Sequence, residues 1–328
     1  MEKYDVVILG GGNAGMGVTV ATRAAGLSVA MIEARDLGGT CPNRGCTPKK
    51  VLVAAAHALD EIARAGTHAI KIEPPTLDWR ALIEREKNII REIPSRLSGL
   101  MAKRGVDVIQ GEAAFISSNA IRVGTREIEA RNIVIATGSK PRPLSIPGLE
   151  FLTTSDDVLS DPVLPRAVVF IGGGVIAFEL GHVYARAGVE VTILEALPQL
   201  LGGLDEDAVA QIRAESERLG ISIHTKAWVK KIEEANGRLR VSFAKDGAEW
   251  RVDADRAVNC AGRVANVEGL DLGAGVIVHR EGRIEIDEHL RSRSNPDVYV
   301  CGDAVWNSPQ LSPVTTYEGG IVGRNIVD

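Results

Sequence analysis

Two cysteines, Cys41 and Cys46, are separated by four intervening residues in a stretch over residues 38–50 that is rich in glycine and proline. A cysteine pair at this spacing can form a disulfide that exchanges with a substrate. Two buried thiols or half of a zinc site would give the same spacing. Zinc requires two further ligands at regular spacing, and neither C-x-x-C nor H-x-x-x-H accompanies the pair. The pattern therefore favours a redox-active disulfide.

The residues around this pair favour the reactive form of a thiol. A thiol attacks as the thiolate, and neighbouring cations lower its pKa. Arg44, Lys49 and Lys50 could supply such cations. The alanine-rich sequence from Val51 predicts a helix, and the N-terminus of a helix also favours negative charge.

A glycine-rich turn near the start of the chain predicts a dinucleotide-binding site. Residues 4–9 are typical of a strand, residues 13–25 of a helix, and residues 27–32 of a second strand that ends at Glu33. Glycine lets the backbone approach a pyrophosphate, the N–H groups of the helix hold its charge, and the acid accepts hydrogen bonds from a ribose. The predicted contacts are Gly10, Gly12, Asn13, Ala14, Gly15 and Glu33.

The same pattern recurs in the second half of the chain, after a predicted strand over residues 168–171. Glu195 follows Gly172 by 23 residues, and Glu33 follows Gly10 by the same number. The repeat predicts a second dinucleotide-binding domain. Its predicted contacts are Gly172, Gly174, Val175, Ile176, Ala177 and Glu195.

The second turn also predicts which nicotinamide cofactor binds. Ala177 replaces the third glycine, which is a permitted small-residue variant. Glu195 favours a free 2′-hydroxyl and repels a 2′-phosphate, and residues 196–204 contain no Arg or Lys that would bind that phosphate. We therefore expect NADH to be preferred over NADPH.

Bulk properties limit the classes of function. A length of 328 residues predicts about two domains. The formal net charge of −5 gives no basic footprint for nucleic acid or for an anionic membrane. Four cysteines are too few for a secreted disulfide scaffold, so we expect a cytoplasmic protein. No apolar run reaches the roughly 18 residues that a membrane helix requires.

The remaining sequence predicts mixed helices and strands around the two turns. The predicted elements are a helix over 77–103 that Pro94 kinks or interrupts, a hairpin over 121–132, a buried strand over 133–138, a stiff connection over 141–147, an amphipathic helix over 204–220 and strands to about 258. The six histidines are scattered and are expected on the surface or in packing roles. Cys260 and Cys301 are expected to be buried thiols, and no metal site is expected.

Taken together, the motifs resemble those of the class I pyridine nucleotide-disulfide oxidoreductases, which include glutathione reductase, dihydrolipoamide dehydrogenase and mercuric reductase. The resemblance covers essentially all 328 residues. It rests on the cysteine segment, on both glycine turns, and on Ala136-Thr137-Gly138, Ala261-Gly262-Arg263 and Val298-Tyr299-Val300-Cys301-Gly302-Asp303.

The resemblance implies an α/β fold in three layers with two Rossmann-like domains, one for FAD and one for NAD(P). The FAD domain would be discontinuous, over residues 1–145 and 266–328, and the NAD(P) domain would span 146–265. To the predicted cofactor-binding residues it adds Gly39, Thr40, Lys50, Ala113, Thr137, Gly138, Gly262, Gly302, Asp303, which would hold the ribityl chain of the flavin, and Ser312.

The resemblance also implies a catalytic cycle. Hydride would pass from NADH to FAD, and the electrons would then reduce the Cys41–Cys46 disulfide. Cys46 would lie against the flavin and Cys41 would exchange with a disulfide substrate. Either Lys49 or Lys50 would lie beside the flavin and pair with Glu179, and the sequence does not choose between the two lysines.

One feature departs from the family pattern, and another matches two branches of the family. Family members usually continue into a C-terminal dimerisation domain with a His–Glu acid–base pair, whereas this chain ends within a helical pattern over 315–327. We therefore expect a truncated form that lacks this general acid and does not dimerise in the usual way. The segments 48–50 and 311–314 resemble the glutathione-reductase branch, and Val175 and Glu195 resemble the dihydrolipoamide branch.

The expected substrate is thus a small or protein-bound disulfide of the glutathione or dihydrolipoamide type. The alternatives are a mercuric reductase, a diaphorase that passes electrons from NADH to quinone or dye acceptors, and a flavoprotein in which the disulfide senses redox state.

Overall fold

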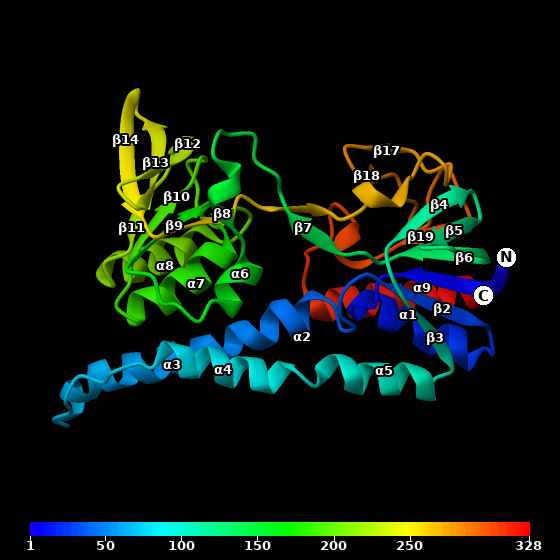
Figure 1. Cartoon of the computed structure of the whole chain (residues 1–328), viewed down its shortest axis with the longest axis horizontal. Coiled ribbons are helices and arrows are strands. Elements are labelled where there is room, and N and C mark those ends of the chain that lie inside the picture. Colours follow the sequence, from blue (N-terminus) through cyan, green and yellow to red (C-terminus); the bar gives the residue numbers. More distant parts are fainter. The chain divides into compact units, whose positions relative to one another are not determined.

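A computed structural model describes residues 1–328, and the chain divides into two compact units (Figure 1). Unit 1 comprises Met1–Asn43, Ile90–Lys140 and Arg263–Asp328, and unit 2 comprises Arg44–Ile89 and Pro141–Gly262. The contacts within each unit define it, and these contacts do not show which nucleotide a unit binds. The assignment of FAD and NAD(P) to the predicted domains therefore stays a prediction. None of the helices combines the length and the apolar character needed to span a membrane.

Unit 1 is built on one mixed sheet with the strand order β3-β2-β1-β6-β5-β4, and β19 pairs with β6. The five strands β3, β2, β1, β6 and β19 run parallel, whereas β4, β5 and β6 pair antiparallel. The strands are β1 (Glu2–Leu9), β2 (Val29–Glu33), β3 (Val106–Gln110), β4 (Ala113–Ser117), β5 (Ala120–Val123), β6 (Arg126–Ile135) and β19 (Val298–Val300).

The alternation of side chains along β1 builds a core on both faces of this sheet. Val7 and Leu9 belong to one buried cluster, and Val6 and Ile8 belong to another, which includes Val18 of a covering helix. All of them are buried, and burial of such a side chain contributes about 1.5–3 kcal/mol relative to exposure. The apolar strand predicted from the sequence is therefore the centre of unit 1.

Glycines bring the two covering helices of this unit into close contact. A side chain at Gly319 would place its Cβ 2.1 Å from the carbonyl oxygen of Ala14, and one at Gly17 would lie 2.7 Å from the carbonyl oxygen of Thr316. The helices and short elements of unit 1 are α1 (Asn13–Ala24), α2 (Thr40–Arg44), which ends at the first residue of unit 2, α5 (Ile93–Lys103), α9 (Ser312–Val327), η3 (Glu268–Leu270), η4 (Gly302–Ala304), β16 (Arg263–Ala265), β17 (His279–Arg280) and β18 (Arg283–Ile284).

Unit 2 contains a parallel sheet with the strand order β11-β10-β9-β15-β8 and an antiparallel sheet with the order β12-β13-β14. The strands are β8 (Leu152–Thr153), β9 (Ala167–Ile171), β10 (Glu190–Leu194), β11 (Ser222–His224), β12 (Trp228–Ala235), β13 (Arg238–Lys245), β14 (Ala248–Ala254) and β15 (Arg256–Asn259), and β7 (Ser139–Pro141) lies at the boundary of the units. The predicted α/β class is confirmed.

The helices of unit 2 pack through an apolar cluster that includes Leu52, Ile83, Phe170 and Tyr184. The ring of Trp79 stacks on that of Tyr184, with 5.4 Å between the centroids. The helices are α3 (Cys46–Arg64), α4 (Trp79–Ile90), which ends at the first residue beyond this unit, α6 (Ser155–Ser160), α7 (Val175–Arg186) and α8 (Glu206–Arg218), and the short elements are η1 (Ala65–His68) and η2 (Leu149–Phe151).

Three sequence-based expectations are refined. Pro94 does interrupt the helix predicted over 77–103, because it occupies the first turn of α5, where a missing N–H costs nothing. The predicted hairpin strand and the buried strand that follows it are one continuous strand, β6. The helix predicted from Val51 begins five residues earlier, at Cys46. The helix can include Pro48 because a proline in the first turn removes no hydrogen bond of the helix.

Candidate active site

The predicted nucleotide contacts of unit 1 gather where parallel strands end. Gly10 follows β1, Glu33 ends β2, Thr137 follows β6, and Gly302 follows β19. These strands are neighbours in one sheet, and the carboxyl ends of parallel strands lie at the same edge. The fold therefore brings together residues that are spread over nearly 300 positions of the sequence.

The first glycine turn has a backbone that tolerates no side chain. Gly10 has φ +113°, and a Cβ there would lie 2.3 Å from the carbonyl oxygen of Ala136. A Cβ at Gly15 would lie 2.0 Å from the carbonyl oxygen of Gly10. Gly12 precedes α1 without a side-chain cap, and Asn13 begins a first turn that contains no acid. The N-terminal amides of α1 are thus suited to an anionic group.

Glu33 supports this turn with both carboxylate oxygens. Its Oε2 accepts a hydrogen bond from the backbone N–H of Gly11 at 2.8 Å, and its Oε1 accepts one from that of Arg35 at 2.7 Å. Each carboxylate oxygen can accept a second hydrogen bond. Glu33 can therefore position the loop and still bind the hydroxyls of a ribose.

A buried hydroxyl at the end of β6 lacks a partner. Thr137 Oγ1 has no hydrogen bond within the protein, although buried polar groups are nearly always satisfied. Nearby in the sequence, Ser139 donates a hydrogen bond to Asp303 at 3.3 Å and accepts one from Arg263 at 2.8 Å. Burial raises the pKa of Asp303, and its hydrogen bond from Ser139 opposes this rise. An unsatisfied hydroxyl and a positioned carboxylate fit the polar groups of a flavin nucleotide.

The other predicted contacts of unit 1 lie on elements around this edge. Gly39 approaches Gly12, since a Cβ on it would lie 2.9 Å from the Cα of Gly12. Ala113 begins β4 shortly after Gly111, whose N–H bonds the carbonyl oxygen of Glu33 at 2.9 Å. Ala14 and Gly302 adjoin each other, and Gly138 has a left-handed backbone with φ +72°. Thr40 begins α2, and Ser312 begins α9.

The second glycine turn, in unit 2, repeats this geometry. Gly172 has φ +111°, and a Cβ there would lie 2.2 Å from the carbonyl oxygen of Cys260. Glu195 Oε2 accepts from the N–H of Gly173 at 2.6 Å, and Oε1 accepts from that of Leu197 at 2.7 Å. Gly174 precedes α7 without a side-chain cap, and no acid occupies the first turn. The repeat found in the sequence is therefore a repeat of hydrogen bonds.

The remaining contacts predicted in unit 2 surround this turn. Val175 and Ile176 begin α7, and Ala177 is fully buried. Gly262 has φ +100°, and its carbonyl oxygen accepts from the N–H of Arg142 at 2.9 Å. Cys260 is buried as predicted, and burial raises its pKa to about 12. Cys301 of unit 1 is also buried, and its pKa is raised for the same reason.

The two cysteines of the predicted disulfide are half-buried and lie on consecutive helices. Cys41 belongs to α2, and Cys46 is the first residue of α3. Gly45 precedes α3, and its carbonyl oxygen accepts from the N–H of Lys49 at 3.0 Å. The first turn of α3 contains no acid, so a thiolate at Cys46 would meet the favourable end of the helix dipole.

The structure distinguishes the two lysines that follow this pair. Lys49 Nζ lies 2.7 Å from Oε1 and 2.8 Å from Oε2 of Glu179, on α7. Lys50 is exposed. Adjacent residues of a helix point about 100° apart, so only one of the two can face α7. The pairing with Glu179 expected from the family resemblance belongs to Lys49.

A second cation near the cysteines is also paired. Arg44 Nε lies 3.6 Å from Asp156 Oδ2, on α6. The sequence predicts that Arg44, Lys49 and Lys50 can supply a positive field to the thiols, and the structure adds that Arg44 and Lys49 each face a carboxylate. Sequence reasoning missed Asp156, which no motif marks.

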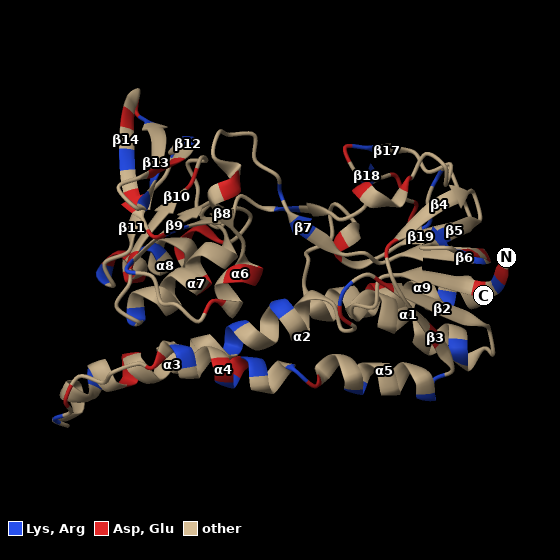
Figure 2. Cartoon of the chain, viewed as in Figure 1, with Lys and Arg blue, Asp and Glu red and all other residues tan.

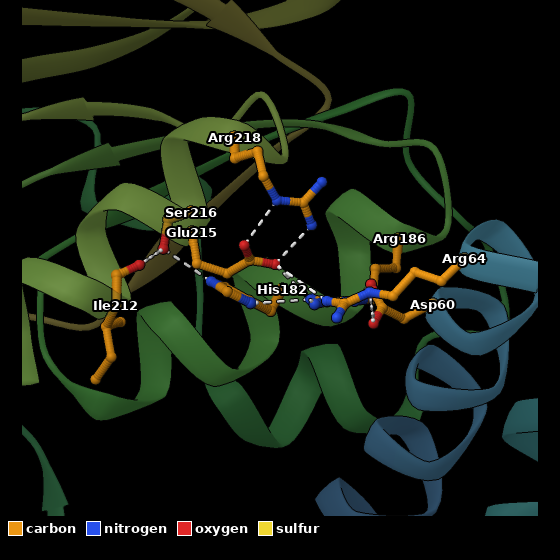
Figure 3. A network of polar contacts seen from close by, with 8 residues as sticks. All are labelled: Asp60, Arg64, His182, Arg186, Ile212, Glu215, Ser216 and Arg218. Carbon is orange, nitrogen blue, oxygen red and sulfur yellow. Dashed lines mark hydrogen bonds and ion pairs between the residues drawn. The ribbon is translucent and has the colours of Figure 1, made fainter. Parts of the chain in front are cut away.

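The far end of α3 is joined to α7 by a charged network (Figure 3). Asp60 on α3 lies 2.9 Å from Arg64 and 3.4 Å from Arg186 of α7. Both arginines also approach Glu215 of α8, and the hydrogen bonds from Arg218 lower the pKa of Glu215 to about 2. Together with the Lys49 pair, this network holds α3 along α7 near both of its ends.

His182 completes the network in Figure 3. Arg186 donates to His182 Nδ1 at 2.9 Å, so the other ring nitrogen carries the proton and donates to Ser216 Oγ at 2.8 Å. Ser216 in turn donates to the carbonyl oxygen of Ile212 at 2.6 Å. Burial and Arg186 lower the pKa of His182. This histidine therefore has the packing role that the sequence suggested.

Charges of both signs are interspersed along the elements of each unit (Figure 2). Both α3 and α8 carry acidic and basic residues, and three ion pairs within these helices join residues three or four positions apart. Exposed pairs of this kind, such as Arg213–Glu217, each contribute about 0.3–0.5 kcal/mol.

Comparison with known proteins relates these features to a family. A family model described as pyridine nucleotide-disulphide oxidoreductase matches residues 4–319. Dihydrolipoyl dehydrogenase from Chlamydia pneumoniae is 32% identical over 332 residues, and that from Geobacillus stearothermophilus is 31% identical over 332 residues; each alignment covers 99% of this chain and 70% of the relative. The Cu(II) complex of the HOCl-induced flavoprotein disulfide reductase RclA from Escherichia coli superposes with a TM-score of 0.86 at 28% identity, covering 98% of this chain and 70% of RclA.

Proposed function

This chain belongs to the pyridine nucleotide-disulphide oxidoreductase family, and from that premise we propose that it is an NADH-dependent reductase that acts through a Cys41–Cys46 disulfide. As a member it is an oxidoreductase whose cofactors are FAD and a pyridine nucleotide. The proposal concerns the identity of the reducing nucleotide, the roles of individual residues and the acceptor.

Unit 1 supplies the residues that would hold FAD. Gly12 and the uncapped start of α1 suit the pyrophosphate, Glu33 suits a ribose, and Thr137 and Asp303 suit the polar groups of the flavin and its ribityl chain. Bound FAD supplies the two-electron chemistry that connects a nicotinamide with a disulfide. The protein contributes position and electrostatics.

Unit 2 supplies the corresponding site for NADH. The start of α7 after Gly174 suits the pyrophosphate, and the carboxylate of Glu195 suits an unmodified ribose. Both Glu195 oxygens already accept a backbone N–H, so the carboxylate is held in place before the nucleotide arrives. A 2′-phosphate would meet this fixed negative charge, which is the physical reason for a preference for NADH.

The observation that carries the proposal is the joint placement of Cys46 and Lys49 on the first turn of α3, with Lys49 held by Glu179. Cys46 begins the helix, so its thiolate is stabilised by the free backbone N–H groups. Lys49 follows three residues later in the same turn, and its ammonium is fixed by two hydrogen bonds to Glu179. Cys41, on the preceding helix, would be the thiol that exchanges with the acceptor.

The proposed acceptor is a small or protein-bound disulfide of the glutathione or dihydrolipoamide type. Two groups of relatives support a disulfide acceptor: the dihydrolipoyl dehydrogenases by sequence and the disulfide reductase RclA by structure. Electrons would leave through thiol–disulfide exchange at Cys41. The Cys41 thiolate would attack the acceptor disulfide, form a mixed disulfide and displace one acceptor sulfur as a thiolate. The Cys46 thiolate would then attack Cys41, which re-forms the Cys41–Cys46 disulfide and displaces the other acceptor sulfur.

Anaerobic titration of the purified flavoprotein with NADH, followed by visible absorption, tests this function. We expect a long-wavelength band after two electrons, which reports a thiolate beside the oxidised flavin, and two newly alkylated cysteines at positions 41 and 46. Cys46→Ser should abolish the band, while Cys260→Ser, at a buried thiol, should retain it. Bleaching without the band, and without new thiols, would overturn the proposal in favour of a diaphorase.

A further inference from the structure

We propose that the ion pair between Arg44 and Asp156 sets the reduction potential of the Cys41–Cys46 disulfide, by cancelling the charge of the cation that lies between the two cysteines. This inference rests on the proposed function, because it assumes that the two cysteines form a disulfide. It assigns Asp156, which belongs to none of the family motifs found in the sequence, as a positioning residue for the charge of Arg44.

Arg44 is close to both cysteines along the chain. It follows Cys41 by three residues within α2, and residues three apart on a helix have their Cβ atoms about 5–6 Å apart. It precedes Cys46, the first residue of α3, by two residues. The side chain of Arg44 is only 16% exposed, so solvent screens its charge less than that of a surface arginine.

Asp156 is held in place independently of Arg44. It lies in the first turn of α6, where the N-terminal end of the helix favours a carboxylate. A capping box fixes this helix, since Asp157 accepts the backbone N–H of Thr154 at 2.7 Å and its hydroxyl at 2.8 Å. Val158 and Leu159 anchor the same helix in the core of unit 2. Removing the carboxylate of Asp156 therefore changes charge without dismantling its support.

The charge balance of the reaction explains why the pair matters. Two electrons and one proton convert the disulfide into one thiol and one thiolate, so the reduced state carries one negative charge more than the oxidised state. A nearby positive charge favours the reduced state and raises the potential, whereas a nearby negative charge lowers it. Arg44 alone would raise the potential, and Asp156 counteracts it.

The substitutions predict shifts of opposite sign. Asp156→Asn removes the carboxylate that faces the guanidinium of Arg44, and we expect the equilibrium constant for reduction of the disulfide to rise about tenfold, which is about 30 mV for a two-electron couple. Arg44→Leu removes the guanidinium and keeps the carboxylate of Asp156, and the constant should fall by a similar factor. The double variant should return to within about threefold of wild type, since both charges are then gone.

The experiment equilibrates the FAD-containing protein anaerobically in dithiothreitol buffers of graded potential, quenches with acid and alkylates the thiols. Mass spectrometry of the peptides that contain Cys41 and Cys46 then gives the fraction of disulfide. Asp253→Asn is the matched control, because it removes the carboxylate of another arginine pair, Arg240–Asp253, at 2.8 Å in the antiparallel sheet. It should leave the potential unchanged.

The outcomes separate the inference from the function on which it rests. If no disulfide forms between Cys41 and Cys46 at any potential, the proposed function fails. If the disulfide forms and both single variants keep the wild-type constant, or shift it in the same direction, the inference about Asp156 is overturned while the function stands. Asp156→Glu restores a carboxylate and should restore the wild-type constant, which a merely structural defect would not do.

Discussion

The ammonium of Lys49 and the carboxylate of Glu179 form two hydrogen bonds, of 2.7 and 2.8 Å, between residues 130 positions apart in the sequence. The pair joins the first turn of α3, which begins at Cys46, to α7, which follows the second glycine turn. Within unit 2, this ion pair thereby connects the helix that begins at Cys46 to the helix that follows the candidate nicotinamide turn.

Replacing Lys49 should impair electron transfer far more than stability. The side chains of Lys49 and Glu179 are 24% and 39% exposed, so loss of the pair should cost no more than about 1 kcal/mol of unfolding free energy. Misplacement of reacting groups costs much more in rate, and we expect Lys49→Met to slow flavin reduction at saturating NADH by about tenfold or more. Stopped-flow absorption measures this rate.

Lys50→Met provides the matched control for this prediction. Lys50 is exposed and is the next residue of the same helix, so the substitution removes the same charge without disturbing the pair with Glu179. Flavin reduction should keep its wild-type rate within about twofold. A larger effect from Lys50→Met than from Lys49→Met would reverse the assignment of the two lysines.

Glu195 should determine the preference for NADH. Glu195→Arg replaces a carboxylate that repels a 2′-phosphate with a cation that binds it, so the ratio of kcat/KM for NADH to that for NADPH should fall by about 100-fold, or about 2.7 kcal/mol. Glu195→Gln is the control, because an amide oxygen can still accept the N–H of Gly173. An unchanged ratio in Glu195→Arg would mean that the ribose is recognised elsewhere.

Local sequence was sufficient to predict the two glycine turns. Gly10 and Gly172 require left-handed backbone, and Glu33 and Glu195 close the same hydrogen bond to the turn, so each feature is encoded within about 25 residues. The short apolar run that ends at the first glycine turn likewise predicted the central strand of unit 1. These features arise from short-range sterics and hydrogen bonds, which a sequence displays directly.

Tertiary pairings could not be predicted in the same way. The choice of Lys49 over Lys50 depends on the rotational phase of α3, which begins at Cys46 and not near Val51. The partner of Arg44 comes from α6, more than 100 residues away. The pairing of Ser139 with Asp303 also joins distant segments. No periodicity or motif specifies these contacts, because they result from how whole elements pack.

Two substitutions in the second glycine turn should separate an effect on stability from an effect on nucleotide binding. Gly172→Ala would place a Cβ 2.2 Å from the carbonyl oxygen of Cys260 at φ +111°, so it should reduce the unfolding free energy by more than about 2 kcal/mol. Gly174→Ala has open space around its Cβ and should change stability by less than about 1 kcal/mol. Chemical denaturation measures both.

The same two variants should differ in NADH binding in the opposite sense. A methyl group at Gly174 projects into the open space before α7, where the backbone would approach a pyrophosphate, so we expect Kd for NADH to rise about tenfold or more. Fluorescence titration measures Kd. Full affinity in a stable Gly174→Ala variant would place the pyrophosphate away from this turn.

A buried acid on α4 should make the stability of the protein depend on pH. Glu86 is 2% exposed, shares the buried face of α4 with Trp79 and Ile83, and its Oε2 has no hydrogen-bond partner. Burial raises the pKa of Glu86 from 4.5 to about 7, and Lys87 only partly opposes this rise. The carboxyl is therefore neutral in the folded protein under mildly acidic conditions.

The sign of the effect follows from proton linkage. Between pH 4.5 and 7 the folded state binds more protons at Glu86 than the unfolded state does. The contribution of Glu86 to the unfolding free energy is therefore fully present below pH 4.5 and is lost as the pH rises through 7. The total loss is on the order of 3 kcal/mol. In urea denaturation at pH 5 to 8, the unfolding free energy of Glu86→Gln should therefore rise relative to wild type as pH increases. Glu84→Gln, at an exposed position of α4, is the control and should keep the wild-type dependence of the unfolding free energy on pH. If the difference in unfolding free energy between Glu86→Gln and wild type is the same at every pH, Glu86 ionises normally in the folded protein.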